Sequence, residues 1–165
     1  MLYAEKYRSP LGGITLLGDA QYLYGLWFDG QKHFGAHYDL AQSQTGHPAP
    51  IQQALVWLDQ YFAGENPDAN SIPLKPEVTA FRQRVLQVLR TVPYGTTITY
   101  KGISDALQTG ESHPKNLARA VGGAVGHNPI SIIIPCHRVV GSDGALTGYA
   151  GGLAKKIALL KLETR

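Results

Sequence analysis

Three short runs that favour β-structure open the chain, over residues 2–7, 14–17 and 22–28. They are rich in aromatic and aliphatic residues, and turn-forming pairs separate them: Ser9-Pro10, Gly12-Gly13 and Gly18-Asp19. Short runs bounded by such residues are typical of β-strands. The pattern therefore predicts a small antiparallel meander of three strands.

A helical pattern follows over residues 51–63, where apolar residues recur three or four apart: Ile51, Ala54, Leu55, Leu58 and Phe62. Residues 66–76 then contain three prolines among Asp, Asn and Ser, which is the composition of a linker. We therefore predict an N-terminal α/β (α+β) domain over residues 1–75 and a separate C-terminal domain over residues 76–165.

The C-terminal domain is predicted to be mainly α. Apolar periodicity predicts helices over residues 79–91 and 100–107, the second capped by Thr99, and a third from Pro114 to Val125. Short helices joined by a polar turn have the outline of a helix-turn-helix, in a winged-helix-like domain.

The third of these helices has an unusual outer face. With Leu117 turned inward and about 100° per residue, Lys115, Arg119, Gly122 and Gly123 point outward. Two glycines inside a helix cost about 1 kcal/mol each relative to alanine, so they need a reason other than helix propensity. Either they pack tightly against another helix, or they form a smooth face that lets a partner approach closely.

A final helix is predicted over residues 153–163. Its apolar face is expected to contain Leu153, Ile157 and Leu160, and its lysines are expected in water: Lys155, Lys156 and Lys161. Glu163 falls on the border of the apolar face, where carboxylates are usually solvated.

Composition and charge exclude several classes of protein. The chain has 165 residues and one cysteine, which excludes an internal disulfide and a cluster of metal-binding thiolates. Its apolar runs are too short for a membrane span, and residues 1–6 lack the apolar core of a signal peptide, so we expect a soluble cytoplasmic protein. Residues 1–76 carry a net charge of −3 and residues 77–165 a net charge of +6. The basic half suits a polyanionic partner, although such a charge is not sufficient for one.

The single cysteine follows the apolar run 130–134, in the sequence Pro135-Cys136-His137-Arg138. We predict a strand that delivers a thiol and an imidazole to one place. A lone cysteine is usually a small buried hydrophobic residue, and the alternative is a Cys/His nucleophile. Because neighbours in a strand point to opposite faces, proton transfer between them is more plausible through a water molecule than directly.

These motifs together resemble a known family, the O6-alkylguanine-DNA alkyltransferases. The resemblance is carried by Pro135-Cys136-His137-Arg138 with its flanks, by Asn128-Pro129, by Arg119-Ala120-Val121-Gly122-Gly123, by Val92-Pro93-Tyr94-Gly95 and by Tyr149 with Gly151-Gly152-Leu153. It is strong over residues 81–163, whereas over residues 1–75 it rests on the order of elements.

The resemblance implies direct reversal of DNA damage without a cofactor or a metal. A protein of this family, monomeric or cooperative on DNA, binds the minor groove of duplex DNA and rotates O6-alkylguanine, or less efficiently O4-alkylthymine, out of the stack. The alkyl group passes irreversibly to the cysteine, one per chain. In a prokaryote such a protein would be associated with the nucleoid.

The resemblance also assigns roles to residues. Cys136 is the nucleophile, His137 accepts its proton through a water molecule, and Glu163 holds the imidazole. Asn128 fixes the turn around the site, and Tyr100 donates a proton to the leaving guanine. DNA contacts are assigned to Lys115, Ala118, Arg119, Ala120, Gly122, Gly123 and Arg138, with Arg119 filling the gap left by the rotated base.

The pocket for the alkylated base is assigned to Ser131, Val139, Tyr149, Ala150 and Gly151. Ser131 and Ala150 stand where animal members have proline and serine, which leaves open the range of alkyl groups and the response to benzylated guanines. Two other readings are a helix-turn-helix regulator and an alkyltransferase-like protein that binds damaged bases without transfer. The regulator does not explain the grouping of Cys136 with its polar partners, and Cys136 itself argues against the second.

Overall fold

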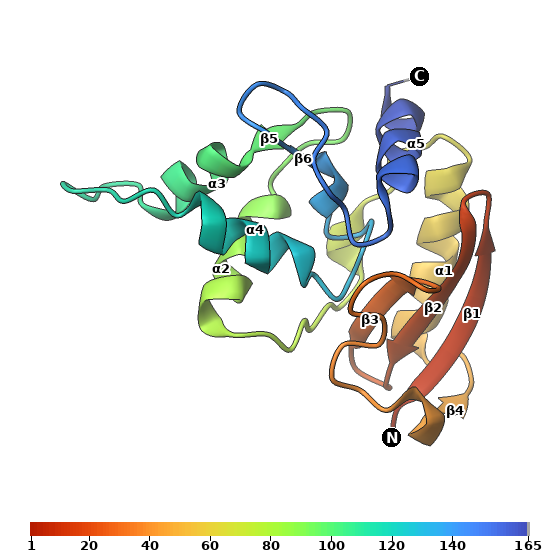
Figure 1. Cartoon of the computed structure of the whole chain (residues 1–165). Coiled ribbons are helices and arrows are strands. Elements are labelled where there is room, and N and C mark those ends of the chain that lie inside the picture. Colours follow the sequence, from red (N-terminus) through yellow and green to blue (C-terminus); the bar gives the residue numbers. More distant parts are fainter. Residues whose placement is uncertain (165) are drawn as a thin grey trace. The chain divides into compact units, whose positions relative to one another are not determined.

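The computed structural model describes residues 1–164 and divides into two compact units (Figure 1). The N-terminal unit contains residues 1–77 and 129–133, and the C-terminal unit contains residues 78–128 and 134–164. The predicted division after residue 75 assigns residues 129–133 to the second domain, but they pack with the first unit. The Leu26 N–H donates to Pro129 O (2.8 Å) and the Ser131 N–H donates to Leu26 O (2.9 Å), which adds this segment beside β3 (Leu23–Phe28).

The sheet of the N-terminal unit has four strands, so the prediction of three is wrong. β1 (Tyr3–Ser9), β2 (Gly12–Gly18) and β3 form the expected antiparallel meander. β4 (Gln44–Thr45) pairs in parallel with β1 and gives the order β3-β2-β1-β4. Because β4 is two exposed polar residues long, no apolar pattern reveals it in the sequence.

The helix α1 (Ala49–Phe62) packs against β1 and β2. Ile51, Leu58 and Tyr61 are fully buried on it, and burying a large apolar side chain contributes roughly 1.5–3 kcal/mol. It begins two residues before the predicted start, because Pro50 is compatible with the first helical turn.

The C-terminal unit is built on three helices that pack against one another: α2 (Ala80–Leu89), α3 (Tyr100–Leu107) and α4 (Ala118–Gly126). The Thr99 side chain accepts the Gly102 N–H at 2.9 Å, which confirms it as the cap of α3. The predicted bounds of α3 are confirmed as well.

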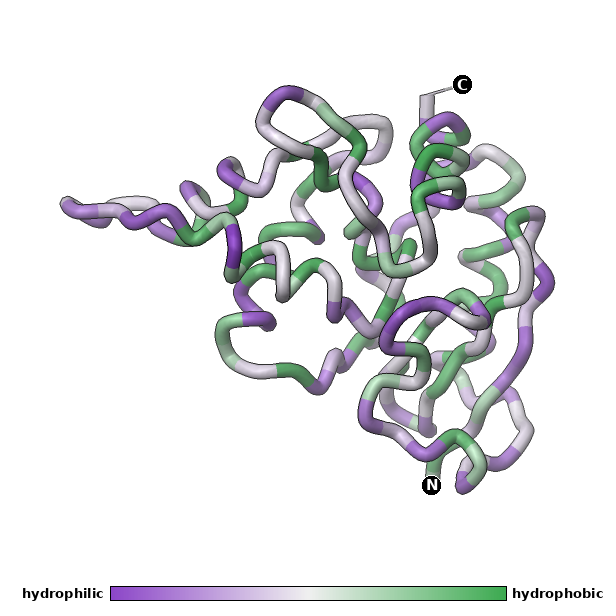
Figure 2. Tube along the Cα trace, viewed as in Figure 1, coloured by the Kyte–Doolittle hydropathy of each residue, from purple (hydrophilic) through white to green (hydrophobic). Residues whose placement is uncertain are grey.

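The prediction that α4 starts at Pro114 is wrong. Residues 108–117 form a polar loop that extends away from the helices and is mostly hydrophilic (Figures 1 and 2). The buried amide of Gln108 pins its base, accepting the Lys115 N–H and donating to Lys115 O, both at 2.6 Å. This loop is longer than the 3–4 residues typical of a helix-turn-helix, and that motif stays a prediction.

The predicted strand over residues 130–134 is not an extended strand. The Ile133 N–H donates to Ser131 O and the Cys136 N–H donates to Ile134 O, both at 2.8 Å, so the chain reverses direction tightly twice. Between these bonds Ile132 has a φ of +68°, which is strained for a β-branched residue. Every residue of the run is buried, so packing overrides its β propensity.

A short 3₁₀ helix, η3 (Cys136–Arg138), follows these turns and leads into β6 (Val139–Val140). β6 pairs in parallel with β5 (Ile98–Thr99). The last helix, α5 (Leu153–Glu163), has its predicted bounds and contacts η3. Within residues 1–164, no helix is long and apolar enough to span a membrane.

The buried face of α5 differs from the prediction. Lys156 is 1% exposed and Glu163 is 5% exposed, although both were expected in or near water, whereas Leu153, expected to be buried, is 45% exposed. The helix is rotated so that Lys156, Leu159 and Glu163 face inward. Two ionisable side chains tolerate this burial only because they find partners inside the unit.

Candidate active site

Cys136 begins η3 and is 4% exposed. Burial raises the pKa of its thiol, while a hydrogen bond from Asn128 and the positive charge of Lys156 lower it. The thiol is therefore surrounded by groups that stabilise a thiolate, although burial keeps it protonated in the resting protein. A nucleophilic cysteine in this setting needs a base.

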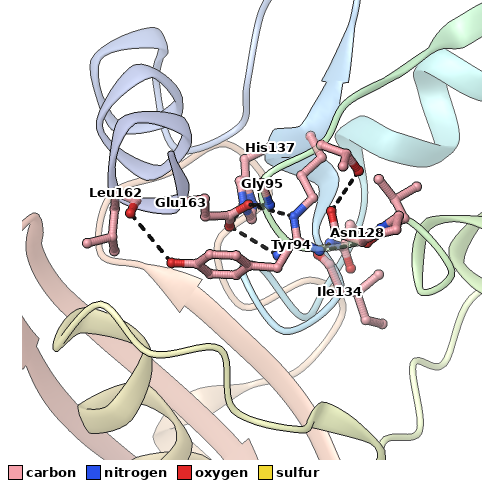
Figure 3. Close-up of polar contacts among 11 residues, drawn as sticks. Tyr94, Gly95, Asn128, Ile134, His137, Leu162 and Glu163 are labelled. Carbon is pink, nitrogen blue, oxygen red and sulfur yellow. Dashed lines mark hydrogen bonds and ion pairs between the residues drawn. The ribbon is translucent and has the colours of Figure 1, made fainter. Parts of the chain in front are cut away.

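Asn128 follows the end of α4 and is buried. Its side-chain amide donates to Ile134 O at 2.9 Å, next to the tight turn that ends at Cys136 (Figure 3). One side chain thus acts both on the backbone before Cys136 and on its sulfur.

His137 and Glu163 form a buried pair at the centre of the site (Figure 3). The distance from His137 Nε2 to Glu163 Oε2 is 2.6 Å, and both side chains are 0% exposed. Because an ionised carboxylate only accepts hydrogen bonds, the proton of a neutral imidazole lies on Nε2. Nδ1 then carries the lone pair, and it has no hydrogen-bond partner among residues 1–164.

The charge state of His137 follows from its surroundings. Burial lowers the pKa of the imidazole, the hydrogen bond and charge of Glu163 raise it, and the charges of Arg138 and Lys156 lower it. The net direction is downward, so the imidazole is neutral near pH 7. A neutral imidazole with a free Nδ1 lone pair is able to accept a proton.

Arg138 was predicted to contact DNA, but the structure buries it in the same network. Its Nε donates to Glu163 Oε1 (2.8 Å), its Nη2 to Glu163 Oε2 (3.1 Å) and its Nη1 to Val92 O (2.8 Å). The side chain is 10% exposed. A guanidinium engaged in this two-pronged ion pair is not available to a phosphate, so we withdraw the DNA contact.

Lys156 also lies in the candidate site, although the sequence pattern predicts it in water. Its Nζ donates to Val139 O at 2.6 Å and to Thr147 O at 3.0 Å, which ties β6 to the loop over residues 141–152. Burial lowers the pKa of this lysine, and the negative charge of Cys136 raises it when the thiol is ionised. A lysine next to another lysine in a helix carries no local signal of burial, and only the spacing to Glu163, seven residues on, places both on one face.

A groove of about 510 Å³ lies along α3 and α4, separate from the buried pair. It is lined by Tyr100, Lys101, Asn116, Ala118, Arg119, Gly122 and Ser142. The Tyr100 hydroxyl lies 3.0 Å from the Thr147 hydroxyl, so both Tyr100 and Lys156 hold Thr147.

The two helix glycines do not serve tight helix packing. A Cβ added at Gly123 meets nothing within 4 Å, and one added at Gly122 meets only the Tyr100 ring, at 3.9 Å. Arg119 and Ala120 are exposed on the same helix, Ala118 is half-buried, and Lys115 is exposed in the preceding loop. Of the two readings of this face, the structure favours a smooth surface open to a partner.

The residues that the resemblance assigns to a base pocket do not all belong to one unit. Val139 is buried in β6, and Tyr149, Ala150 and Gly151 are half-buried in the loop before α5. Ser131 belongs to the N-terminal unit, where its backbone pairs with Leu26. Cys136, His137, Asn128 and Glu163 therefore lie in one network, which also contains the side chains of Arg138 and Lys156. Tyr100 and Arg119 lie at the groove instead.

Two family profiles match the chain. Residues 2–76 match the ribonuclease-like domain of 6-O-methylguanine DNA methyltransferase, and residues 80–165 match its DNA binding domain. The methylated-DNA–protein-cysteine methyltransferase of Haemophilus influenzae is 42% identical over 162 residues, covering 98% of this chain and 86% of its own. The protein of the same name from Mycobacterium tuberculosis is 41% identical over 164 residues, with 99% and 93% covered.

Solved structures give the same result for the fold. The crystal structure of Mycobacterium tuberculosis OGT in complex with DNA aligns with a TM-score of 0.85 at 40% identity, covering 98% of this chain and 92% of that one. The O6-methylguanine-DNA methyltransferase from the archaeon Pyrococcus kodakaraensis aligns with a TM-score of 0.68 at 27% identity over the whole of both chains.

Proposed function

The chain belongs to the 6-O-methylguanine DNA methyltransferase family, and we propose that it repairs alkylated DNA by moving the alkyl group from guanine O6 to the Cys136 sulfur. The observation that carries this proposal is the burial of the only cysteine beside the His137–Glu163 pair, with His137 Nδ1 without a partner in residues 1–164. A regulator that only binds DNA has no use for such an arrangement.

Transfer begins with deprotonation of the thiol. His137 Nδ1 takes the proton of Cys136 through a water molecule, and the imidazolium that forms is stabilised by Glu163. The sulfur lone pair attacks the alkyl carbon, a C–S bond forms, and the C–O6 bond breaks with its electron pair going to guanine. A thioether is a poor leaving group, so each chain acts once.

The leaving guanine needs a proton as it gains electron density. Tyr100 is the proposed donor to guanine N3, because its hydroxyl lies at the groove and is oriented by Thr147. The carbonyls of Cys136 and Val139 are the proposed acceptors for the exocyclic amine. The Val139 carbonyl already accepts a hydrogen bond from Lys156, which fixes its direction while one lone pair stays available.

DNA is proposed to bind through the open face of α4 in the minor groove. The small residues Gly122 and Gly123 allow the helix to lie close to the groove floor, and Arg119 fills the space of the rotated base. Support comes from this open face and from the relative whose structure is a complex with DNA. O6-alkylguanine is the proposed substrate, with O4-alkylthymine less efficient, and the pocket is proposed to include Val139, Tyr149, Ala150 and Gly151 of the C-terminal unit.

The proposed function is tested by mass spectrometry. Incubation with a duplex that carries one O6-methylguanine is expected to add one methyl group to the peptide containing Cys136, with no turnover beyond one equivalent. An unmodified duplex of the same sequence is the control. Methyl on another residue, repeated turnover or no transfer would contradict the proposal.

The role of Arg119 is tested separately. We expect Arg119→Ala to slow transfer from duplex DNA by about tenfold or more, since about 1.4 kcal/mol of lost stabilisation of the rotated base corresponds to that factor. The rate with the free base O6-methylguanine should not change, because nothing has to be rotated out. Lys115→Ala, an exposed change nearby, is the comparison for the loss of one positive charge. Equal losses with duplex and free base would remove the role.

A further inference from the structure

The turn between α2 and β5 contacts the Arg138–Glu163 ion pair, whose carboxylate also bonds His137. This turn, Val92-Pro93-Tyr94-Gly95, is one of the motifs of the family resemblance, yet the proposed chemistry gives it no role. Val92 O accepts Arg138 Nη1 at 2.8 Å, and the Tyr94 ring centroid lies 5.8 Å from the guanidinium carbon. The Gly95 N–H donates to Glu163 Oε1 at 3.2 Å, and the Tyr94 hydroxyl reaches Leu162 O at 3.5 Å (Figure 3).

The turn depends on its glycine. Gly95 has a φ of +78°, where side chains are strained, and a Cβ there would lie 3.1 Å from Glu163 O. A side chain at this position would therefore both strain the turn and press on the end of α5. The close approach lets a backbone N–H reach the carboxylate.

Both oxygens of Glu163 are engaged. Oε1 accepts from Arg138 Nε and Gly95 N, and Oε2 accepts from Arg138 Nη2 and His137 Nε2. A carboxylate that accepts this many hydrogen bonds is stabilised in its ionised form, so it does not take the proton from the imidazole. It is also held in one orientation, since the planar fork of Arg138 fits both oxygens.

We propose that Arg138 is a positioning residue that, together with the 92–95 turn, holds Glu163 ionised and aimed at His137 Nε2, so that Nδ1 stays unprotonated and ready to accept a proton. This inference rests on the proposed function for its catalytic meaning. Without Arg138, the carboxylate would be a buried anion with the imidazole as its main counter-charge. The imidazole would then hold a second proton and could not accept one from Cys136.

The charged groups that face His137 act in opposite directions on its protonation. Glu163 on α5 favours the charged imidazole, and Arg138 on η3 and Lys156 on α5 oppose it. Removing Arg138 thus shifts the His137 pKa upward, toward protonation at neutral pH. A purely structural role for Arg138 predicts lower stability, but no change in the tautomer or in the pH at which His137 is protonated.

The native protein gives the first test. With ¹⁵N-labelled histidine, the His137 signals, assigned by their loss in His137→Gln, are expected to show the neutral Nε2–H tautomer at pH 7. The Nδ1–H tautomer or an imidazolium at pH 7 would overturn the proposal. This measurement requires no variant to fold.

The second test compares Arg138→Met, Arg138→Lys and the exposed control Arg90→Met. In Arg138→Met, His137 is expected to become protonated at higher pH, and alkylation of Cys136 by iodoacetamide should become severalfold slower near pH 6. Arg138→Lys keeps the charge and loses the fork, so an intermediate shift is expected, and Arg90→Met should match the native protein.

Unchanged titration of His137 in a folded Arg138→Met protein overturns the proposal. If that variant does not fold, an unchanged tautomer and titration in Arg138→Lys overturns it instead. Neither readout uses DNA. Failure of the proposed function would appear as absence of methyl transfer from the duplex and would leave these titrations as they are.

Discussion

Cys136→Ala protein is expected to transfer no alkyl group while it still binds duplex DNA. No other cysteine exists in the chain to replace the nucleophile. The thiol is buried and its loss removes one sulfur atom, so the fold should lose only about 1 kcal/mol. Binding should persist, because the proposed DNA-binding face on α4 is a separate surface. Mass spectrometry of the protein and gel shifts with methylated duplex measure the two properties.

This variant also separates the competing functions. A base-binding protein without transfer activity would behave identically with and without Cys136. We expect instead that the native protein releases repaired duplex, whereas Cys136→Ala keeps its preference for the methylated one. Cys136→Ser serves as a second control, because a hydroxyl of similar size ionises far less readily than a thiol. Methyl found on the alanine variant would sink the assignment of the acceptor.

Glu163→Gln is expected to slow methyl transfer by roughly 10²–10⁴-fold at neutral pH, the range that general acid–base catalysis contributes. The glutamine side chain replaces one carboxylate oxygen with an NH₂ group, which cannot accept the hydrogen bonds that His137 and Arg138 donate to Glu163. His137 then loses the acceptor that fixes its tautomer and the charge that stabilises its protonated form. Single-turnover rates with methylated duplex measure the loss.

The pH dependence distinguishes this cause from general damage. As pH rises toward the raised pKa of the Cys136 thiol, the thiol ionises without a base, so the difference between native and variant rates should narrow. Glu111→Gln, an exposed change, is the matched control. Because a broken buried ion pair costs about 3–5 kcal/mol, thermal melts must show that the variant is folded at each pH. A rate ratio that stays constant across pH would contradict the proposed role.

The periodic elements could be predicted from the sequence. The meander and the helices α1, α3 and α5 follow from apolar spacing and from local caps such as Thr99, which need no distant partner. Cys136 could be proposed as a nucleophile because a unique cysteine beside a histidine is a local signal, and that role stays a prediction. The chemistry of its surroundings came from resemblance rather than from pattern.

Burial of charge could not be predicted from the sequence. Arg138 and Lys156 look like solvated cations when only their neighbours in the chain are considered. Their partners are Glu163, 25 residues after Arg138, and carbonyls 17 and 9 residues before Lys156. A local pattern carries no information about such contacts, and a β-branched run such as 130–134 likewise gives no sign that its packing will fold it into turns.

Residues 129–133 lie within the C-terminal half of the sequence but pack in the N-terminal unit, and this limits how the protein can be divided into fragments. A fragment that starts at residue 78 contains Cys136 and the His137–Glu163 pair, yet it leaves the buried residues 129–133 without β3, with which they pair. The backbone hydrogen bonds of Pro129 and Ser131 to Leu26 would be missing, a few residues before the turn that ends at Cys136. We therefore expect that the C-terminal unit cannot be transplanted by itself, and that a graft or a truncation has to include β3.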